Sequence, residues 1–369
     1  MAESQRKNDK TFAIAGDRTS PTLQWVGDGL QKVLVKHGHE FQAEPMPDVR
    51  FVLNFVDPAK PRPFRRKAQA TFVMGISELE GQPEVMRAGY PVLVRSLSNM
   101  MMLLVHGEGG LEAHFLTIEQ GHYIVTYRQG EDEAFFEEVY ERIEPLASSE
   151  LVINNVFETD LEEELWDGDE NTKQLEEAGR FLDSMNLLPA PFPVQEILEE
   201  RDLRHIYRLY GLGGLSYGNL SARRDATRFW MSASGVDKGK IGTIGEDILL
   251  VKDFDEKSPA LILSVPPHAQ PKRVSVDAIE HYMIYREHPD VGAIVHVHAW
   301  MDNIPVTEMN YPCGTREIAL AVSELVRQQP EPARAVIGLK NHGVTITGRS
   351  MREILERVEG KMSPHVPMS

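Results

Sequence analysis

The sequence predicts an α/β protein with two domains. Its 369 residues exceed the size that one hydrophobic core usually serves. Runs of β-branched residues alternate with segments in which apolar residues recur every three or four positions, as in strands and amphipathic helices. Hydrophobic residues make up 41% of the chain and charged residues 26%, a balance typical of globular proteins.

The first domain is predicted over residues 11–157, after a polar leader at 1–10 that we expect to be disordered. Strands are expected at 11–15, 48–56 and 64–76, twice within 114–127, and at 151–157, and helices at 21–36, 83–105 and 131–146. The strand, Gly16-Asp17 and helix that open it are not followed by Gly-x-Gly-x-x-Gly, so a dinucleotide fold is not predicted. Ligand binding, regulation and assembly all stay open for this half.

Residues 158–193 are predicted to link the domains. The acidic run at 158–171 is interpreted as a solvated linker rather than a cation site. A helix is expected at 172–185, and a proline-rich break follows at 188–193. The second domain is therefore assigned to residues 194–369, beginning with a helix at 197–210 that ends before Gly211.

Charge and cysteine content exclude several classes of partner. The net charge is −17 and the isoelectric point about 5.3, which disfavours nucleic acid and anionic membranes. No apolar run approaches the ~20 residues that span a bilayer. Cys313 is the sole cysteine, so no intrachain disulfide forms, and we expect a cytoplasmic protein. Cys313 itself is interpreted as a packing residue.

A His-x-His pair follows the buried apolar run at 293–295. Alternate side chains of a strand share a face, so His296 and His298 project together, about 7 Å apart at their Cα atoms. His342 lies in a second turn, Asn341-His342-Gly343, after the strand expected at 335–340. Three histidines with an open position suit a catalytic divalent metal, Zn²⁺ above all. The alternative is histidines that only hydrogen-bond to backbone or solvent.

Two glycine-rich loops precede this strand. The loop at 211–223 contains Asn219 and Ser221, and the loop at 231–238 contains Ser234, Gly235 and Lys238. Backbone N–H groups and hydroxyls in such loops suit a phosphate or carboxylate. The alternatives are ordinary turns and, for Lys238, a surface lysine. Downstream, Ser275 is expected to cap a helix at 278–287, and Asp277 to lie at the positive end of its dipole.

Residues 194–362 resemble the class II aldolase/adducin family. The resemblance rests on an ordered set of motifs: residues 218–223, Ser234-Gly235, residues 281–290, His296-x-His298 and Asn341-His342-Gly343. It implies a C-terminal three-layer α/β/α sandwich around a mostly antiparallel sheet. It also implies a divalent metal, most often Zn²⁺ with Mn²⁺ or Co²⁺ as alternatives, held by His296, His298 and His342.

The resemblance assigns roles to the remaining motif residues. Substrate binding falls to Asn219, Ser221, Ser234, Gly235 and Ser275, and Lys238 and Arg223 are candidates to hold an acidic end of the substrate. Asp277 occupies the place of the family glutamate and is expected to transfer the proton. Val276 replaces a phosphate-binding serine, so a phosphorylated substrate is not assured.

The activity that the resemblance implies is that of a metal-dependent lyase. Its substrate would be a small ketose, sugar phosphate or hydroxy-keto acid, cleaved by aldol-type chemistry through a stabilised enediolate. Epimerase, dehydratase and decarboxylase activities of the same family stay open, as does a non-catalytic binding or assembly module like adducin. Family enzymes are commonly tetramers, so a homo-oligomer is expected.

Overall fold

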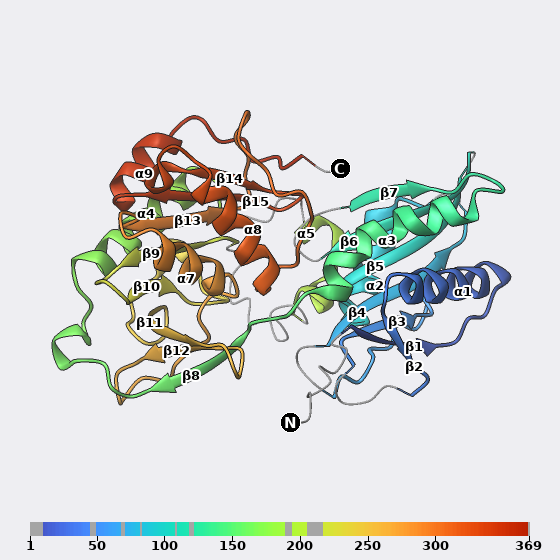
Figure 1. The fold of residues 1–369 in the computed structure, drawn as a ribbon, viewed down its shortest axis with the longest axis horizontal. Helices are drawn as coiled ribbons and strands as arrows, with labels where there is room; N and C mark the ends of the chain where they lie inside the picture. Colours follow the sequence, from blue (N-terminus) through green and yellow to red (C-terminus); the bar gives the residue numbers. More distant parts are fainter. Residues whose placement is uncertain are drawn as a thin grey trace, which may run out of the picture. The chain divides into compact units, whose positions relative to one another are not determined.

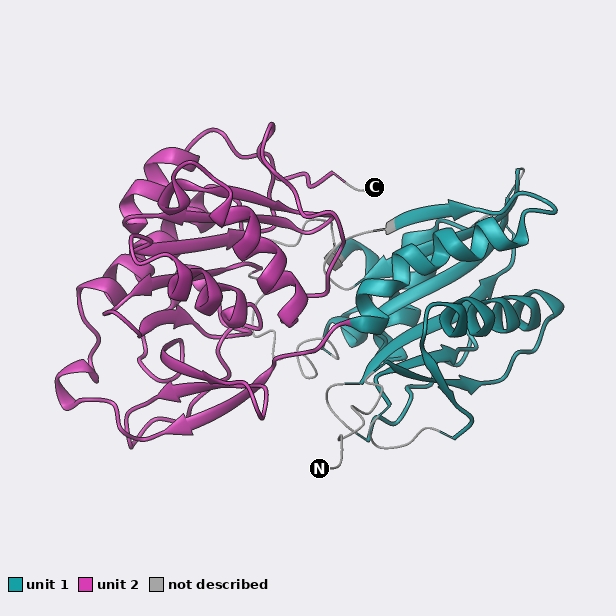
Figure 2. Cartoon of the chain, viewed as in Figure 1, with its two compact units in different colours: residues 1–148, 193–205 teal, residues 149–192, 206–369 magenta. Residues whose placement is uncertain are grey.

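The computed structural model describes residues 10–44, 49–67, 71–81, 83–107, 109–117, 122–188, 194–204 and 217–367. The chain divides into two compact units (Figure 2): unit 1 comprises residues 1–148 and 193–205, and unit 2 comprises residues 149–192 and 206–369. The leader before Lys10, the proline-rich break at 189–193 and the glycine-rich residues 211–216 lie outside the described residues.

Unit 1 contains a seven-stranded mixed sheet (Figure 1) with the order β2-β1-β3-β4-β5-β6-β7. Its first five strands pair in parallel, and β5, β6 and β7 pair antiparallel. The strands are β1 (Thr11–Gly16), β2 (Glu40–Gln42), β3 (Phe51–Phe55), β4 (Phe72–Leu79), β5 (Met100–Gly107), β6 (Gly110–Thr117) and β7 (His122–Thr126). This separate N-terminal α/β region confirms that part of the predicted fold.

The helices of unit 1 include α1 (Pro21–Lys36), α2 (Val85–Arg95), α3 (Asp132–Ser148) and the short α5 (Val194–Ile197), and residues 200–204 are also helical. Helices α1 and α3 pack together so closely that a Cβ at Gly29 would collide with the ring of Phe136. Helix α2 packs on β5 and β6, with Gly89 against Leu103.

The prediction of one helix over residues 83–105 is wrong. Helix α2 ends at Arg95, Leu97 adopts a left-handed conformation with φ 54°, and β5 starts at Met100. The run of methionine and leucine at the start of β5 is fully buried between β4 and β6. A strand buried on both faces reads as a continuous apolar run, which sequence periodicity does not distinguish from a buried helix.

Unit 2 contains an eight-stranded sheet with the order β14-β15-β13-β9-β10-β11-β12-β8. All its pairs are antiparallel except β12 with β8, as the predicted family fold requires. Its strands are β8 (Asn154–Glu158), β9 (Asn219–Arg223), β10 (Phe229–Ser232), β11 (Ile248–Asp255), β12 (Ala260–Ser264), β13 (Ala293–Val297), β14 (Val336–Leu339) and β15 (Gly343–Gly348).

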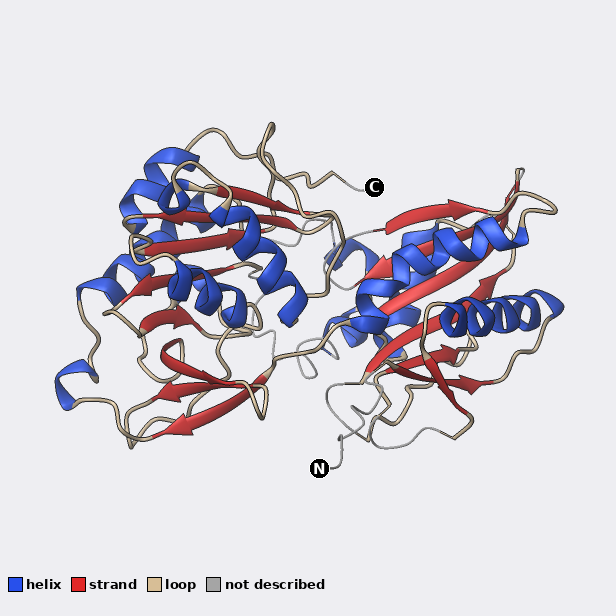
Figure 3. Cartoon of the chain, viewed as in Figure 1, coloured by secondary structure: helices blue, strands red, loops and turns tan. Residues whose placement is uncertain are grey.

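Helices cover both faces of this sheet (Figure 3): α4 (Glu170–Ser184), α7 (Ala278–Glu287), α8 (Arg316–Arg327) and α9 (Met351–Val358), with short 3₁₀ turns η1 (Glu163–Leu165), η2 (Lys238–Lys240) and η3 (Pro332–Arg334). Ser221 of β9 bonds to α7, whereas its neighbour Leu220 lies beside Gly179 of α4. Helix α8 packs beside α7, and α9 beside α4. The three-layer α/β/α arrangement is therefore as predicted. Among the described residues, every helix is too short or too polar to cross a bilayer.

The segment assigned to a linker is part of unit 2. Strand β8, counted with the first domain in the sequence analysis, pairs with β12 at the edge of the second sheet. Helix α4 buries Leu175, Ala178 and Leu182 in the core of unit 2. Burial of these apolar residues offsets the cost of ordering an acidic segment.

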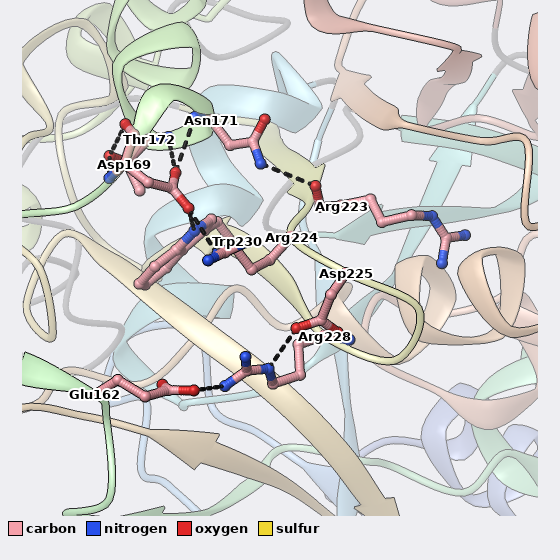
Figure 4. Close-up of polar contacts among 9 residues, drawn as sticks. All are labelled: Glu162, Asp169, Asn171, Thr172, Arg223, Arg224, Asp225, Arg228 and Trp230. Atoms are coloured by element: carbon pink, nitrogen blue, oxygen red, sulfur yellow. Dashed lines mark hydrogen bonds and ion pairs between the residues drawn. The ribbon is translucent and has the colours of Figure 1, made fainter. Parts of the chain in front are cut away.

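Acidic residues of this segment make defined contacts rather than facing solvent freely (Figure 4). Asp169 caps α4 by accepting from the backbone N–H groups of Asn171 and Thr172, at 2.8 and 3.1 Å. Its second oxygen accepts from the indole N–H of Trp230 at 2.9 Å and lies 3.0 Å from Arg224. Glu162 pairs with Arg228 at 2.7 Å. These two carboxylates therefore bind the segment to β10 and to the turn between β9 and β10.

We predict that Asp169→Ala destabilises the protein by about 2–3 kcal/mol, because a helix cap and the partner of a buried indole N–H are lost together. Urea unfolding measures the change. Asp167→Ala, an exposed acidic residue two positions away, is the matched control and should stay within about 0.5 kcal/mol of wild type. Equal stability of the two variants would contradict the fastening role of Asp169.

Candidate metal centre

Strand β13 carries the His-x-His pair in the middle of the sheet, between β15 and β9. His296 pairs with Asn219 on one side and with Thr345 on the other, and all three side chains face the α7 layer. His298 follows the end of the strand. Both histidines are buried, with 1% and 6% of their surface exposed. The strand therefore places both rings on the same side, as the spacing predicts.

A tight turn between β14 and β15 brings His342 to the pair. Asn341 adopts a left-handed conformation with φ 57°, and a Cβ at Gly343 would collide with the carbonyl oxygen of Val297. His342 is 1% exposed, and its Nε2 atom lies 3.1 Å from Nε2 of His298. One ring nitrogen from each of the three histidines lies within 4.8 Å of the others.

The three imidazoles are held in the neutral form that binds metals. Burial lowers the pKa of His296 against the opposing effect of Asp277, and it lowers the pKa of His298 and of His342 well below the usual range. Nδ1 of His296 lies 3.1 Å from the carbonyl oxygen of Val344, so Nδ1 carries the proton and Nε2 has a free lone pair. Nε2 of His296 is buried and has no hydrogen-bond partner among the described residues.

Asp277 and Asn219 lie together on the same face as His296. Asn219 is buried at the start of β9 and donates from Nδ2 to Oδ2 of Asp277 at 2.8 Å. The other carboxylate oxygen, Oδ1, is buried without a hydrogen-bond partner in the described structure. Asp277 is the N-cap residue of α7, but its side chain makes no capping bond. The cap predicted at Ser275 is also not found; Ser275 is buried, and its backbone N–H donates to Ser232.

Lys238 is a buried lysine rather than a surface one. It belongs to η2, is 4% exposed, and its carbonyl oxygen lies where a Cβ on Gly179 of α4 would be. Burial lowers its pKa to about 8, against the opposing effect of Asp277 and Asp237. Its positive charge also contributes to the lowered pKa of His296 and His298, so the ammonium group lies near both imidazole rings.

Two predicted substrate-binding side chains instead hold α7 against the sheet. The hydroxyl of Ser221 lies 2.7 Å from Nδ1 of His281 and 2.8 Å from the Tyr285 hydroxyl. Arg223 donates to the carbonyl oxygens of Tyr285, His288 and Val291 at 2.7–2.9 Å. These bonds occupy the hydrogen-bonding groups that a substrate would need. The Arg223 guanidinium is therefore engaged with the end of α7 and the turn that follows it.

Ser234 and Gly235 form the turn that follows β10. The backbone N–H of Ser234 donates to the carbonyl oxygen of Arg273 at 2.8 Å, and Gly235 has a φ of 70°. The Ser234 side chain is half-buried. The turn leads directly into η2 and so positions Lys238.

Sequence reasoning missed two residues beside the histidines. Cys313, interpreted as packing, places its Sγ atom 3.3 Å from Nε2 of His342. The ring of Tyr217 lies against that of His298, with centroids 5.3 Å apart and an angle of 50° between the ring planes. Cys313 is 15 positions beyond His298 in an irregular loop, so no strand or helix period links it to the histidines.

Glu280 is a third residue whose position the sequence did not reveal. It lies in the first turn of α7, is 1% exposed, and accepts from the hydroxyl of Thr345 at 2.5 Å. Burial, reinforced by the charge of Asp277, raises the pKa of its carboxyl to about 8. Glu280 is therefore protonated at neutral pH, beneath the strand that carries His296.

Comparisons with known proteins match the part of the chain that runs from β9 to β13. The sequence profile described as Class II Aldolase and Adducin N-terminal domain matches residues 202–301, within the predicted range. A methylthioribulose-1-phosphate dehydratase of Klebsiella pneumoniae (strain 342) is 24% identical over 174 residues, covering 39% of this chain and 79% of that protein. The same enzyme of Leptospira biflexa serovar Patoc is 27% identical over 136 residues, covering 36% and 61%.

Among solved structures, an L-fuculose 1-phosphate aldolase is 18% identical, with a TM-score of 0.35; the match covers 52% of this chain and 82% of that one. The profile match and the dehydratase relatives confirm the resemblance of the C-terminal unit to the class II aldolase/adducin family.

We predict that Glu280→Gln gains stability relative to wild type as the pH rises. The wild-type carboxyl is ionised above about pH 4.5 when unfolded but stays protonated up to about pH 8 when folded. The unfolded wild type is therefore favoured increasingly across this window, by at most about 1.4 kcal/mol per pH unit. Urea unfolding between these pH values, with a chelator present, measures the difference.

Glu287→Gln, which removes an exposed carboxylate from the end of the same helix, is the matched control. A Glu280→Gln difference from wild type that stays constant with pH would show that the buried carboxyl is ionised in the folded protein.

Proposed function

We propose that this protein is a divalent-metal-dependent lyase acting on a small hydroxy-carbonyl compound by aldol-type cleavage. One observation carries the proposal: three buried, neutral histidines direct ring nitrogens at one another within 4.8 Å. Without a cation, Nε2 of His296 is left buried with no hydrogen-bond partner in the described structure. An unpaired buried polar atom costs free energy, so a bound ligand is the simplest reason for the cluster.

The donor set fits a borderline divalent cation. Nitrogen ligands about 2.0–2.1 Å from Zn²⁺ in a tetrahedral site lie about 3.3 Å from one another, and Nε2 of His298 and His342 are 3.1 Å apart. Imidazole ligands suit Zn²⁺ most, with Mn²⁺ and Co²⁺ as weaker alternatives. Bound there, the ion would act as a Lewis acid that polarises a substrate carbonyl.

The chain's own residues would handle the proton and the charge. Asp277 is placed to move a proton through Oδ1, which has no partner in the described structure, while Asn219 holds Oδ2 and fixes the carboxylate. Lys238 places a positive charge near Asp277, suited to an oxygen that becomes negative during cleavage. The side chain of Asp277 is one methylene shorter than the glutamate of the family. The hydrogen bond from Asn219 orients its carboxylate.

A second candidate is dehydration of a hydroxy-carbonyl compound, which the names of the curated relatives favour. Removal of water and cleavage of a C–C bond both begin with a polarised carbonyl and a positioned base, so this site serves either reaction. Epimerisation and decarboxylation use the same groups. A non-catalytic module, the remaining alternative, has no need for neutral histidines or a buried lysine at one place.

We predict about one divalent metal per purified chain, with Zn²⁺ the first expectation. The variant His296→Ala/His298→Ala should lose it, because two of three ligands are gone. Elemental analysis measures the content after dialysis. His268→Ala/His365→Ala, two exposed histidines outside the cluster, is the matched control and should retain the metal. A metal-free wild type after incubation with Zn²⁺, Mn²⁺ and Co²⁺ would refute the metal centre.

We predict that Asp277→Asn retains the metal but lowers kcat by a factor on the order of 10²–10⁴, because the base is lost while its shape is kept. Cleavage assays on ketose phosphates and hydroxy-keto acids, alongside a dehydration assay on methylthioribulose 1-phosphate, decide between the two reactions. Asp290→Asn, an exposed aspartate beyond α7, is the control and should leave kcat unchanged. Full activity of Asp277→Asn would exclude Asp277 as the proton carrier.

A further inference from the structure

Unit 1 contains a cavity of about 1460 Å³ at the carboxyl ends of its parallel strands. The ends of β1, β3 and β4 line it, together with the loop from Asp57 to Arg65 and with His106 near the end of β5. Typical small-molecule sites enclose about 300–1000 Å³, so the space is ample for a ligand of nucleotide size. It belongs to unit 1 alone and shares no residue with the histidine cluster of unit 2.

The cavity lies where strand order predicts a ligand site. The chain runs from β1 to its neighbour β2 on one side, and then crosses to β3 on the other side of β1. Loops at the carboxyl ends diverge at such a reversal and leave a crevice, which is where open parallel sheets bind ligands. The β2-β1-β3-β4-β5 order is one of the doubly wound arrangements that place a ligand between the first and third strands.

Gly16, the last residue of β1, lies in the lining of this crevice. It has a φ of 79°, and a Cβ at this position would collide with the carbonyl oxygen of Phe55 at the end of β3. The chain then turns through Asp17 to Ser20, which caps α1 and bonds to Glu78 across the cavity. The N-terminal end of a 16-residue helix therefore opens on the cavity and favours negative charge there.

Three cationic side chains of the cavity are left without carboxylate partners. Lys60, Arg62 and Arg65 line it, and none of them forms an ion pair within the described structure. The lining also carries four carboxylates, of which Asp57 accepts from the N–H of Ala59 and Glu78 pairs with His106 at 3.1 Å, both within the cavity. Charge without a protein partner, gathered at one cavity, is suited to an anionic ligand.

The lining also has an apolar side and two carboxylates that form no ion pair in the described part of the chain. Phe64, half-buried against the core of unit 1, and Leu79 offer surface for a base or another flat apolar group. Asp17 and Glu80 offer acceptors for hydroxyl groups of a sugar. A ligand that combines phosphate, sugar and an apolar ring would use all three kinds of surface.

We propose that this cavity binds a nucleotide, with its phosphates held by Lys60, Arg62 and Arg65. The sequence lacks the Gly-x-Gly-x-x-Gly loop that presents backbone amides to phosphates, and in its place the structure offers side-chain cations from the loop after β3. Unit 1 would then be a nucleotide-sensing domain joined to the metal-containing unit. The inference does not depend on the reaction proposed for unit 2.

Isothermal titration calorimetry on the full chain tests it, with ADP, pyrophosphate and adenosine as separate probes. We expect one ADP per chain, weaker binding of pyrophosphate and of adenosine, and loss of ADP affinity as salt rises from about 0.05 M to about 0.3 M. Arg62→Ala/Arg65→Ala should weaken ADP binding about tenfold or more, because two phosphate contacts are removed.

Lys32→Ala/Arg128→Ala is the matched control. It also removes two exposed positive charges from unit 1, at positions outside the cavity, and should bind ADP like wild type. Circular dichroism of both variants verifies folding. No heat with ADP at about millimolar concentration, equal ADP affinity in both double variants, or adenosine binding as tight as ADP would each overturn the proposal; pyrophosphate binding as tight as ADP would overturn its nucleoside part.

Discussion

The close approach of two glycines to strand β13 is the constraint on which the histidine cluster depends. A side chain at Gly218 would collide with the carbonyl oxygen of His296, and one at Gly343 with that of Val297. Only a residue without a Cβ lets the chain pass so near. The first approach sets Asn219 opposite His296, and the second delivers His342 to the same place. The absence of a Cβ at Gly218 and at Gly343 therefore sets the positions of the candidate ligands.

Hydrogen bonds in the interior of unit 2 maintain this geometry. Arg223 and Ser221 fix α7 on the sheet, and α7 in turn presents Asp277 and Glu280 beneath β13. Because the surroundings are dry, burial lowers the pKa of Lys238 and raises that of Glu280, each to about 8, so both groups are shifted toward their neutral forms. A site of this kind is set in advance and needs little rearrangement when a ligand enters.

Much of the site could be predicted because it follows short-range rules. The two-residue period of a strand joins His296 to His298, and Asn341-His342-Gly343 marks a turn by composition alone. Other features could not be predicted, because they depend on contacts between residues that are far apart in the sequence. Cys313 reaches His342 through a loop, Ser221 and Arg223 are occupied by α7, and β5 reads like a helix because both its faces are buried. Strand β8 was counted with the first domain and α4 with a linker, although their contacts lie with residues 52–106 positions later.

The path of the chain between the units has a consequence for their biosynthesis and inheritance. Unit 1 consists of two separate stretches, and residues 149–192 of unit 2 run between them. A ribosome therefore delivers the edge strand and a core helix of unit 2 before unit 1 is complete. No single cut separates two whole domains, and a gene fragment beginning at residue 194 would lack β8 and α4. Unit 1 therefore cannot be exchanged as one contiguous cassette, whereas residues 149–369 hold all of unit 2 together with the short second stretch of unit 1.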